Sequence, residues 1–379
     1  MFRDVFLFEL RYRFRQPSTY IYFGILFAIG FIFLAVEETF FGPSTGGKVF
    51  KNAPDTLANF TLGGSMLAMF ITAAIVGTPI YRDDKEGITG LLYTTPMHKP
   101  AYLGGRFAAS ILVIWFIMSG ISLGAMAGSV MPWLNPAKYG PFRLDAYLIP
   151  LVGGAFVNAF FAGCIFFAAY LFTRSSLVIY LGGIVLFLLY AIAGVVTTNL
   201  NNEHLAGLLD PFGLDTRTVV TKYWTIAERN TKMLPFGSGD MLENRLLWVG
   251  VGLIFLALSY ASFRMGAPRS SGKATAPELT TPPVGLGIRR SPVSFGAGTG
   301  LWQMGQLTQV QFLNVVRAWS FRALVFFGIV NVLFSAYYRY TGDRVQMPVT
   351  YEILSLINNG FSLFFLIIIT VYSGELVWR

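Results

Sequence analysis

Hydrophobic positions along this chain gather into eight long runs, and short polar segments separate them. Each run is close to the 20 or so residues that an α-helix needs to cross the hydrocarbon core of a bilayer. The runs cover residues 20–36, 62–81, 107–130, 146–172, 177–196, 246–263, 321–338 and about 353–377. This pattern predicts an all-α polytopic membrane protein with six spans, a polar stretch and two further spans.

The composition agrees with a membrane protein and limits its chemistry. Hydrophobic residues make up 54% of the 379 positions and charged residues 12%, which excludes an ordinary soluble domain. The one cysteine, Cys164, lies inside an apolar run, so the chain forms no internal disulfide. The two histidines, His98 and His204, are far apart and lack the spacing of metal ligands. We therefore expect no metal site. For Asn158 within the fourth run we expect a hydrogen bond between helices, and the alternative is that it lines a transport route.

Basic residues lie mainly on one side of the predicted spans. If the N-terminus is cytoplasmic, most of the 28 Lys and Arg residues lie in the cytoplasm, and the positive-inside rule favours this orientation. The net charge of +9 then belongs to the cytoplasmic face, which attracts anionic membrane lipids. Because the basic residues flank spans and form no single stripe, we do not expect a nucleic-acid partner.

The segment between the second and third runs, "RDDKEGITGLLYTTPMHKPAYLGGR" at 82–106, has an internal pattern. A hairpin between two spans has to leave the bilayer to turn, so its charges alone are compatible with a simple solvated turn. However, Ile88, Leu91 and Leu92 recur at helical spacing after Glu86-Gly87. This spacing predicts a short amphipathic helix that stops at Pro96.

The order of these features resembles the intracellular coupling loop of ABC-2 type transporter permeases. In that loop a charged group, a Leu-Leu pair, a Thr-Pro pair and a late basic residue recur. A short helix of the loop fits into a cleft of a separate ATPase subunit. The resemblance implies that the coupling residues of this chain are Arg82, Asp83, Asp84, Glu86, Gly87, Thr89, Leu91, Leu92, Thr95 and Pro96.

The N-terminal segment also fits this family, whose permeases begin with an amphipathic helix along the inner leaflet. In "FRDVFLFELRYRFR", apolar residues such as Phe6 and Leu10 share one side, while Arg3, Arg11 and Arg15 are placed to reach lipid headgroups. The alternative is a basic N-terminus that only flanks the first span.

The long polar segment at 199–245 is the predicted external loop, and we interpret it as the outer lid of a permease. It contains five groups that could serve acid–base catalysis: Glu203, His204, Asp210, Asp215 and Glu228. No characteristic spacing or nucleophile motif accompanies them, so we assign no catalytic residue.

A nucleotide site is not expected in this chain. The segment "GPSTGGKV" at 42–49 satisfies most of a P-loop pattern, but Val49 stands where Ser or Thr would bind Mg²⁺. The resemblance instead implies that ATP and Mg²⁺ bind to the partner ATPase.

The family resemblance implies a function. It indicates the permease subunit of an ATP-driven ABC exporter in the bacterial inner membrane, with a cytoplasmic N-terminus and no enzymatic site of its own. The alternative is the membrane anchor of a larger zinc aminopeptidase-like enzyme, because "KYWTIAERN" and "ENRLLW" are similar to segments of permeases fused to such a domain. An HExxH motif in a longer form of the chain would support the alternative.

The chain also contains an internal repeat. The "YFGILFAIGFIF" region of the first span is echoed by "FFGIVNVLFSAYY" after a Pro/Gly/Ser-rich stretch. We therefore expect a first permease half at 1–265, a flexible cytoplasmic linker at 266–305 and the start of a second half at 306–379. The natural chain would then continue to twelve spans, and a homodimer is the other way to supply a second half.

Overall fold

The computed structural model describes most of the chain, which divides into two units, residues 1–265 and 266–379. The described residues are 1–36, 48–95, 97–174, 182–183, 186, 190, 203–263, 297–341, 349–355, 357–358, 361, 364–365 and 368–369. They contain helices and no β-strand, as an all-α polytopic protein requires.

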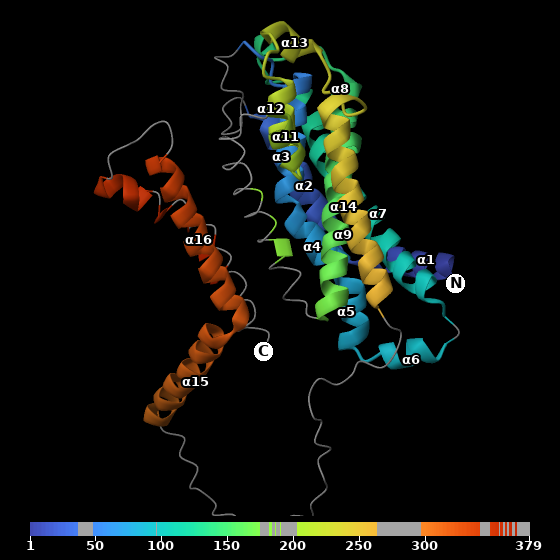
Figure 1. Cartoon of the computed structure of the whole chain (residues 1–379), viewed down its shortest axis with the longest axis vertical. Coiled ribbons are helices and arrows are strands. Elements are labelled where there is room, and N and C mark those ends of the chain that lie inside the picture. The colour runs from blue at the N-terminus through green and yellow to red at the C-terminus, as the bar shows by residue number, and fades with distance from the viewer. Residues whose placement is uncertain are drawn as a thin grey trace, which may run out of the picture. The chain divides into compact units, whose positions relative to one another are not determined.

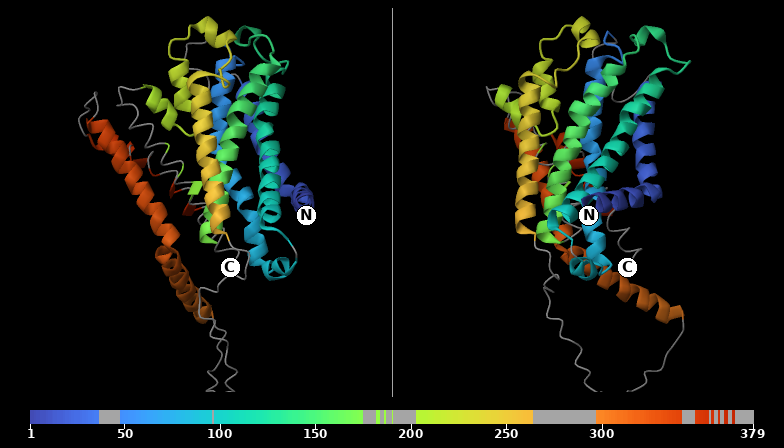
Figure 2. Two further views of the ribbon diagram at one scale, coloured as in Figure 1. Left: turned by 45° about the vertical axis from the view of Figure 1, so that its right-hand side comes forward. Right: turned by 90° about the vertical axis from the view of Figure 1, so that its right-hand side faces the viewer.

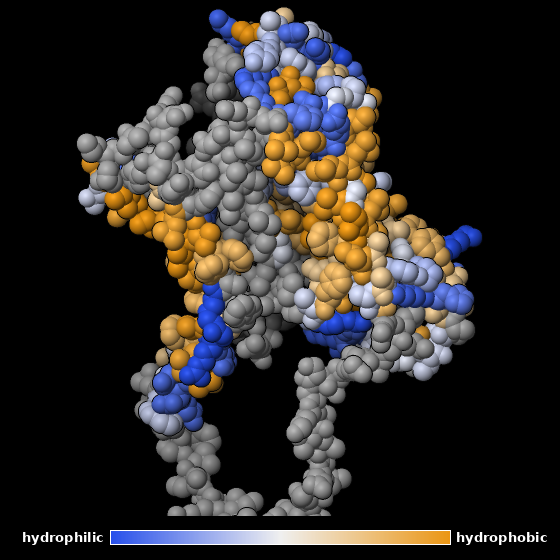
Figure 3. All heavy atoms as spheres, in the orientation of Figure 1, coloured by the Kyte–Doolittle hydropathy of each residue, from blue (hydrophilic) through white to orange (hydrophobic). Residues whose placement is uncertain are grey.

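The first unit is a bundle of long apolar helices (Figure 1). Within the described residues, four helices are long and apolar enough to cross a membrane: α2 (Pro17–Ala35), α7 (Lys99–Ser129), the continuous helix Leu144–Thr173 and α14 (Gly239–Ser262). A fifth candidate is the pair Pro54–Leu67 and Met69–Lys85, which is bent by 42°. Figure 3 shows hydrophobic residues around the middle of this unit and hydrophilic residues at both ends, as expected for a bundle that crosses a bilayer.

The observed helices place the predicted spans and refine their ends. The second span consists of α3 (Pro54–Leu67) and α4 (Met69–Val76), which meet at Ala68, and α5 (Thr78–Lys85) continues it. The fourth consists of α8 (Leu144–Pro150), the π-turn η2 (Leu151–Ala155) and α9 (Phe156–Thr173). This π-turn directly follows Pro150, which lacks the N–H that a regular helix uses.

The remaining predicted spans differ in how far they are described. Helix α7 begins eight residues before the predicted start of the third span, because Pro100 at its first turn suits a helix N-terminus. The fifth and eighth predicted spans lie largely outside the described residues.

Helices α2 and α7 pack with their backbones in contact. Glycines recur every four residues along α7, and a Cβ at Gly120 would lie 2.8 Å from the carbonyl oxygen of Phe23. Cβ atoms at Gly124 and Gly128 would collide in the same way with the carbonyls of Phe27 and Phe31. A stripe of small residues is the usual way for membrane helices to approach closely, because lipid supplies no hydrophobic force between them.

Short helices lie at the two ends of the bundle. Helix α1 (Phe2–Arg15) runs across the end that also carries α5 and α6 (Thr89–Thr94) (Figures 1 and 2). The opposite end carries α12 (Leu214–Val220), α13 (Ile226–Thr231) and the turn η1 (Pro136–Lys138), and α11 (Glu203–Leu209) precedes α12. The bundle therefore has one polar end that contains residues 82–106 and another that contains the described part of the predicted external loop.

The second unit contains α15 (Ala297–Arg317) and α16 (Trp319–Thr341). Helix α16 covers the seventh predicted span. Helix α15 begins within the segment 266–305 that we predicted to be a flexible linker, so the last nine residues of that segment are helical. Residues 264–296 lie outside the described part of the chain.

Candidate functional site

The segment 82–106, which we call the coupling loop, is built around a tight helix end. Helix α5 stops at Lys85, and Gly87 adopts φ +68°, a left-handed conformation that glycine tolerates best. The Gly87 N–H donates to the carbonyl of Asp84 (3.3 Å) and the Ile88 N–H to that of Asp83 (3.1 Å). These two bonds form a Schellman motif, which ends a helix and turns the chain sharply.

The predicted short helix follows this turn. Helix α6 spans Thr89–Thr94, and the hydroxyl of Thr95 closes it by donating to the carbonyl of Leu92 (2.6 Å). Leu92 packs against the apolar core of the bundle, whereas Ile88 leaves 42% of its surface exposed. Pro96 and the side chain of Leu91 lie outside the described residues. Helix α6 therefore has one side anchored to the bundle and one side open.

A buried glutamate of α1 joins that helix to the coupling loop. Glu9 is fully buried and accepts hydrogen bonds from Arg13 Nε (3.0 Å), Arg82 Nη2 (2.9 Å) and Arg106 Nη1. Arg13 also donates to the carbonyl of Ile75, near the junction between α4 and α5 (2.9 Å). The guanidinium of Arg82 stacks 3.9 Å from the ring centre of Tyr12. One carboxylate thus connects α1, α5 and the start of α7.

A second carboxylate, Asp83, continues this network on the side of α7. Arg106 Nη2 lies 3.0 and 2.8 Å from its two oxygens, and the hydroxyl of Tyr102 donates to it (2.8 Å). Asp83 and Arg106 are 3% and 5% exposed. Charge-assisted hydrogen bonds of this kind are about twice as strong as neutral ones, and they fix the position of α5 against α7.

A third carboxylate, Asp84, connects the coupling loop to α9. It accepts from the hydroxyl of Tyr170 (2.8 Å) and from Arg174 Nη1 (2.9 Å). Arg174 ends α9 in a left-handed conformation, with φ 52°, and its guanidinium lies over the ring of Phe263 just after α14. The consecutive aspartates Asp83 and Asp84 on α5 therefore form ion pairs with two different helices, α7 and α9.

The electrostatics of Glu9 favour its ionised form. Burial alone would raise the pKa of Glu9, but the guanidiniums of Arg106, Arg82 and Arg13 outweigh burial and hold the pKa below its usual value. The Glu9–Asp83 network contains two carboxylates and three guanidiniums, so it carries a net positive charge in a buried place. Removing one partner from such a network is expected to be costly.

A groove separates α1 from the coupling loop. It has a volume of about 470 Å³, and it combines apolar and charged walls. Val5 and Phe8 of α1 form one side, and Glu86, Ile88 and Leu92 of the coupling loop form the other. A partner that binds in this groove would therefore contact both α1 and the exposed side of the coupling loop.

The residues predicted from the family resemblance lie in different environments. Among the predicted coupling residues, Arg82, Asp83 and Asp84 hold the bundle together, whereas Glu86, Gly87 and Thr95 are exposed and Thr89 is buried. The sequence analysis missed the partners of these residues on other helices: Glu9, Arg13, Tyr102, Arg106, Tyr170 and Arg174. One local signal was available, because Glu9 and Arg13 are four residues apart on a predicted helix.

The opposite end of the bundle holds two further polar clusters. Buried Asp55 of α3 accepts from Arg217 Nη2 (2.6 Å) and Arg229 Nη1 (3.3 Å), so α12 and α13 are tied to α3. Asn158 of α9 accepts from Arg245 Nη1 (2.6 Å) and donates to Ser65 Oγ (2.8 Å). The prediction that Asn158 bonds between helices is confirmed.

The five candidate acid–base groups of the external segment make several different contacts, and two of them, Asp210 and Asp215, are neighbours. Glu203 pairs with Lys222, Glu228 forms a capping box with Thr225, and Asp210 accepts from the backbone N–H of Asp215. The ring of exposed His204 lies between the carboxylates of Asp240 (3.1 Å) and Glu243 (3.5 Å), which is a surface ion-pair arrangement when the imidazole is protonated.

Comparison with known proteins identifies the central part of the chain. Residues 55–215 match the family described as ABC-2 family transporter protein. This region includes the whole coupling loop and its partners on α7 and α9. No curated protein and no solved structure matches the chain significantly. The family match over this region and the long apolar helices together support an ABC-2 type permease, a multi-pass membrane component of an ABC transporter.

Proposed function

We propose that this permease couples ATP hydrolysis by a separate ATPase subunit to the export of a substrate across the bacterial inner membrane. The ATPase contacts the coupling loop and the neighbouring groove along α1, and it holds the ATP and Mg²⁺. The N-terminus, α1 and the coupling loop lie in the cytoplasm, and the described part of the external segment lies outside. Permeases of this family work with an ATPase subunit in general, which supports the assignment of a partner.

The observation that carries this proposal is the attachment of the coupling loop to several helices at once. Glu9 links Arg82 to α1, Asp83 links α5 to α7, and Asp84 links α5 to α9. A force applied to the coupling loop therefore reaches α1, α7 and α9 through charged contacts, which are largely buried at Glu9 and Asp83 and partly exposed at Asp84, instead of through a flexible hairpin. Rigid elements of this kind are required if a local push is to tilt whole spans.

The exposed side of the loop offers the test. A photoreactive benzoylphenylalanine in place of Ile88, which is 42% exposed, should crosslink to a protein that carries both Walker motifs of an ABC ATPase. The same probe in place of Tyr223, which is 84% exposed on the opposite end of the bundle, should not. Capture of the ATPase from position 223 and not from position 88 would overturn the proposal.

A matched pair of glycines tests whether the loop also transmits the signal. Gly87 and Gly239 are both exposed, both have positive φ (+68° and +59°), and a Cβ at either meets no atom within 4 Å. Gly87→Val should abolish stimulation of the partner ATPase, whereas Gly239→Val imposes a similar local strain and should leave stimulation intact. Equal stimulation by both variants would contradict coupling through this turn.

A further inference from the structure

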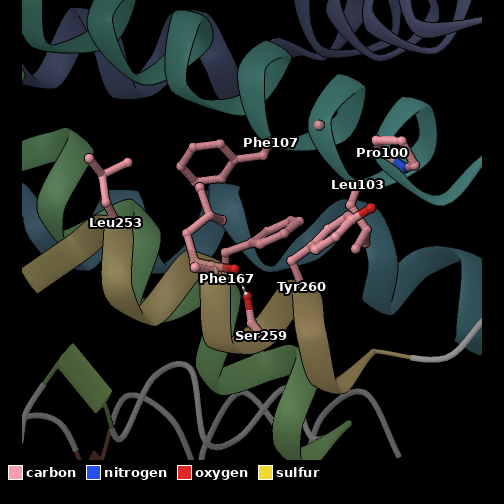
Figure 4. A pocket seen from close by; sticks show the side chains of 10 residues that line it. Pro100, Leu103, Phe107, Phe167, Leu253, Ser259 and Tyr260 are labelled. Carbon is pink, nitrogen blue, oxygen red and sulfur yellow. Dashed lines mark hydrogen bonds between the residues drawn. The ribbon is translucent and has the colours of Figure 1, made fainter.

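An apolar pocket opens between α7, α9 and α14, beside the coupling loop. Figure 4 shows side chains from the three helices pointing toward one another across it, including Phe107 of α7, Phe167 of α9 and Tyr260 of α14. Its volume is about 510 Å³, which lies within the range of small-molecule sites. The hydroxyl of Ser259, which also lines the pocket, is already used, because it donates to the carbonyl of Leu256 (2.8 Å). The pocket therefore offers its occupant apolar contacts and almost no hydrogen bonds.

The pocket runs parallel to the two helices that border it. On α7 its lining extends from Pro100 to Phe107, and on α14 from Tyr260 back to Leu253. Seven residues of an α-helix span about 10 Å, so the pocket is an elongated slot. One end lies at the first turn of α7, beside Pro100, and the other lies farther into the apolar part of the bundle, at Phe107 and Leu253. This shape suits a hydrocarbon chain that lies along the helices.

A lysine lies at the end of the slot where α7 begins. Lys99, the residue before Pro100, places its Nζ 4.3 Å from the ring centre of Tyr260 and 6.0 Å from that of Phe263. In the described part of the chain, no carboxylate lies within ion-pair distance of this Nζ. A lysine whose stem lies on apolar surface and whose charge sits at the membrane boundary is placed to meet a lipid headgroup.

We propose that this slot binds an anionic phospholipid of the cytoplasmic leaflet, with an acyl chain between α7 and α14 and the phosphate at Lys99. The charge at the rim complements the headgroup, and the apolar walls complement the tail. A hydrocarbon-lined slot at bilayer depth is a poor place for water, which would need polar partners that the lining lacks. Because Lys99 and Pro100 belong to the coupling loop, the lipid occupies the place where this loop meets α7.

Photolabelling of the whole chain tests this site directly. The chain is reconstituted in nanodiscs of phosphatidylcholine that contain a small amount of phosphatidylglycerol with a diazirine in its acyl chain. After irradiation, mass spectrometry should find the label on peptides of α7 and α14 that line the slot, such as those containing Phe107 and Leu253. Label spread evenly over all lipid-facing helices would overturn the proposal.

Two variants separate the headgroup contact from the tail contact. Lys99→Gln should lower labelling by phosphatidylglycerol about five-fold, the ratio expected for one lysine at an anionic surface. It should leave labelling by a diazirine-bearing phosphatidylcholine unchanged. Ala257→Trp, which fills the slot, should lower labelling by both lipids. Lys48→Gln removes an exposed lysine at the opposite end of the bundle and serves as the control of equal charge.

Each result decides one part of the proposal. Unchanged phosphatidylglycerol labelling in Lys99→Gln would refute the headgroup contact, and unchanged labelling in a correctly folded Ala257→Trp would refute the acyl-chain site. Should Ala257→Trp elute as an aggregate, competition in the unmodified chain decides the same question, because unlabelled phosphatidylglycerol should displace the label better than phosphatidylcholine. All readouts measure lipid binding without an ATPase, so their failure would leave the proposed transport function untouched.

Discussion

Replacing Glu9 with Gln should destabilise the bundle strongly. The substitution keeps the size of the side chain and removes its negative charge. Glu9 is fully buried and accepts from Arg13, Arg82 and Arg106, two of which, Arg13 and Arg106, are only 5% exposed. After the change, Asp83 is the one carboxylate left in the network to face three guanidiniums.

The magnitude follows from the burial of these charges. Breaking a buried ion pair by removing one partner costs about 3–5 kcal/mol, because it leaves an uncompensated buried charge. For a unit of this size, the apparent Tm falls by roughly 2–4 °C per kcal/mol, so Glu9→Gln should lower it by roughly 6–20 °C. Adding Arg82→Gln restores the original net charge of the network. The double variant should therefore lose less stability than the two single variants lose together.

The assay is thermal unfolding of the purified chain in detergent at one scan rate, since membrane proteins often unfold irreversibly. Asp4→Asn is the matched control, because Asp4 lies on the same helix, is exposed and pairs only with the N-terminus in the described structure. It should leave the apparent Tm unchanged. If Glu9→Gln has the same apparent Tm as Asp4→Asn, the account of a buried charge network is wrong.

The pH dependence has a definite sign. Because the pKa of Glu9 is held below its usual value of 4.5, its contribution to stability is fully present above that value and is lost as pH falls through the lowered pKa. The difference in stability between the unmodified chain and Glu9→Gln should therefore stay constant from neutral pH down to the usual pKa of a glutamate side chain. It should narrow only at more acidic pH.

Three further predictions concern packing, the external segment and orientation. Gly124→Val should lower the yield of folded protein and reduce the free energy of unfolding by at least about 1–3 kcal/mol, because its side chain would collide with the backbone of α2. Gly24→Ala is the control: its Cβ meets no atom within 4 Å, and thermal melts should show no loss of stability. Burial and a neighbouring carboxylate raise the pKa of Asp215 to about 6, so the folded state favours the protonated carboxyl, and the stability that it contributes is lost as pH rises through that value. In pH-dependent melts, Asp215→Asn should therefore be more stable than the unmodified chain by about 1–3 kcal/mol near pH 8, and the two should become equal in acid. A cysteine at position 222 should react with a membrane-impermeant thiol reagent from outside and one at position 85 should not, and the reverse pattern would refute a cytoplasmic N-terminus.

The external segment shows how far local reasoning reaches. The turn after α11 is formed by neighbouring residues, because Asp210 accepts hydrogen bonds from the backbone N–H groups of Phe212 and Asp215. The attachment of this segment to α3 through Asp55 was not predictable, because Asp55 and Arg217 are 162 residues apart. Nothing in the sequence distinguishes a buried aspartate at the start of a helix from an exposed one.

The sequence by itself determined the features that depend on neighbouring residues. Long apolar runs specify spans because each backbone group in a bilayer has to be bonded within its own helix. Gly87 specifies a sharp helix end because a left-handed residue without a Cβ costs little there, and α6 follows it as the spacing predicts. These outcomes need no information from distant parts of the chain.

Only the tertiary structure decided which polar groups act together. Glu9, Asp83 and Arg106 belong to three different helices, and their charges become strong contacts only when packing removes them from water. The glycine stripe of α7 likewise acquires its meaning from the approach of α2. Hydropathy reports how much each residue prefers to leave water, but the partner that makes a buried charge stable is chosen by how the helices cross.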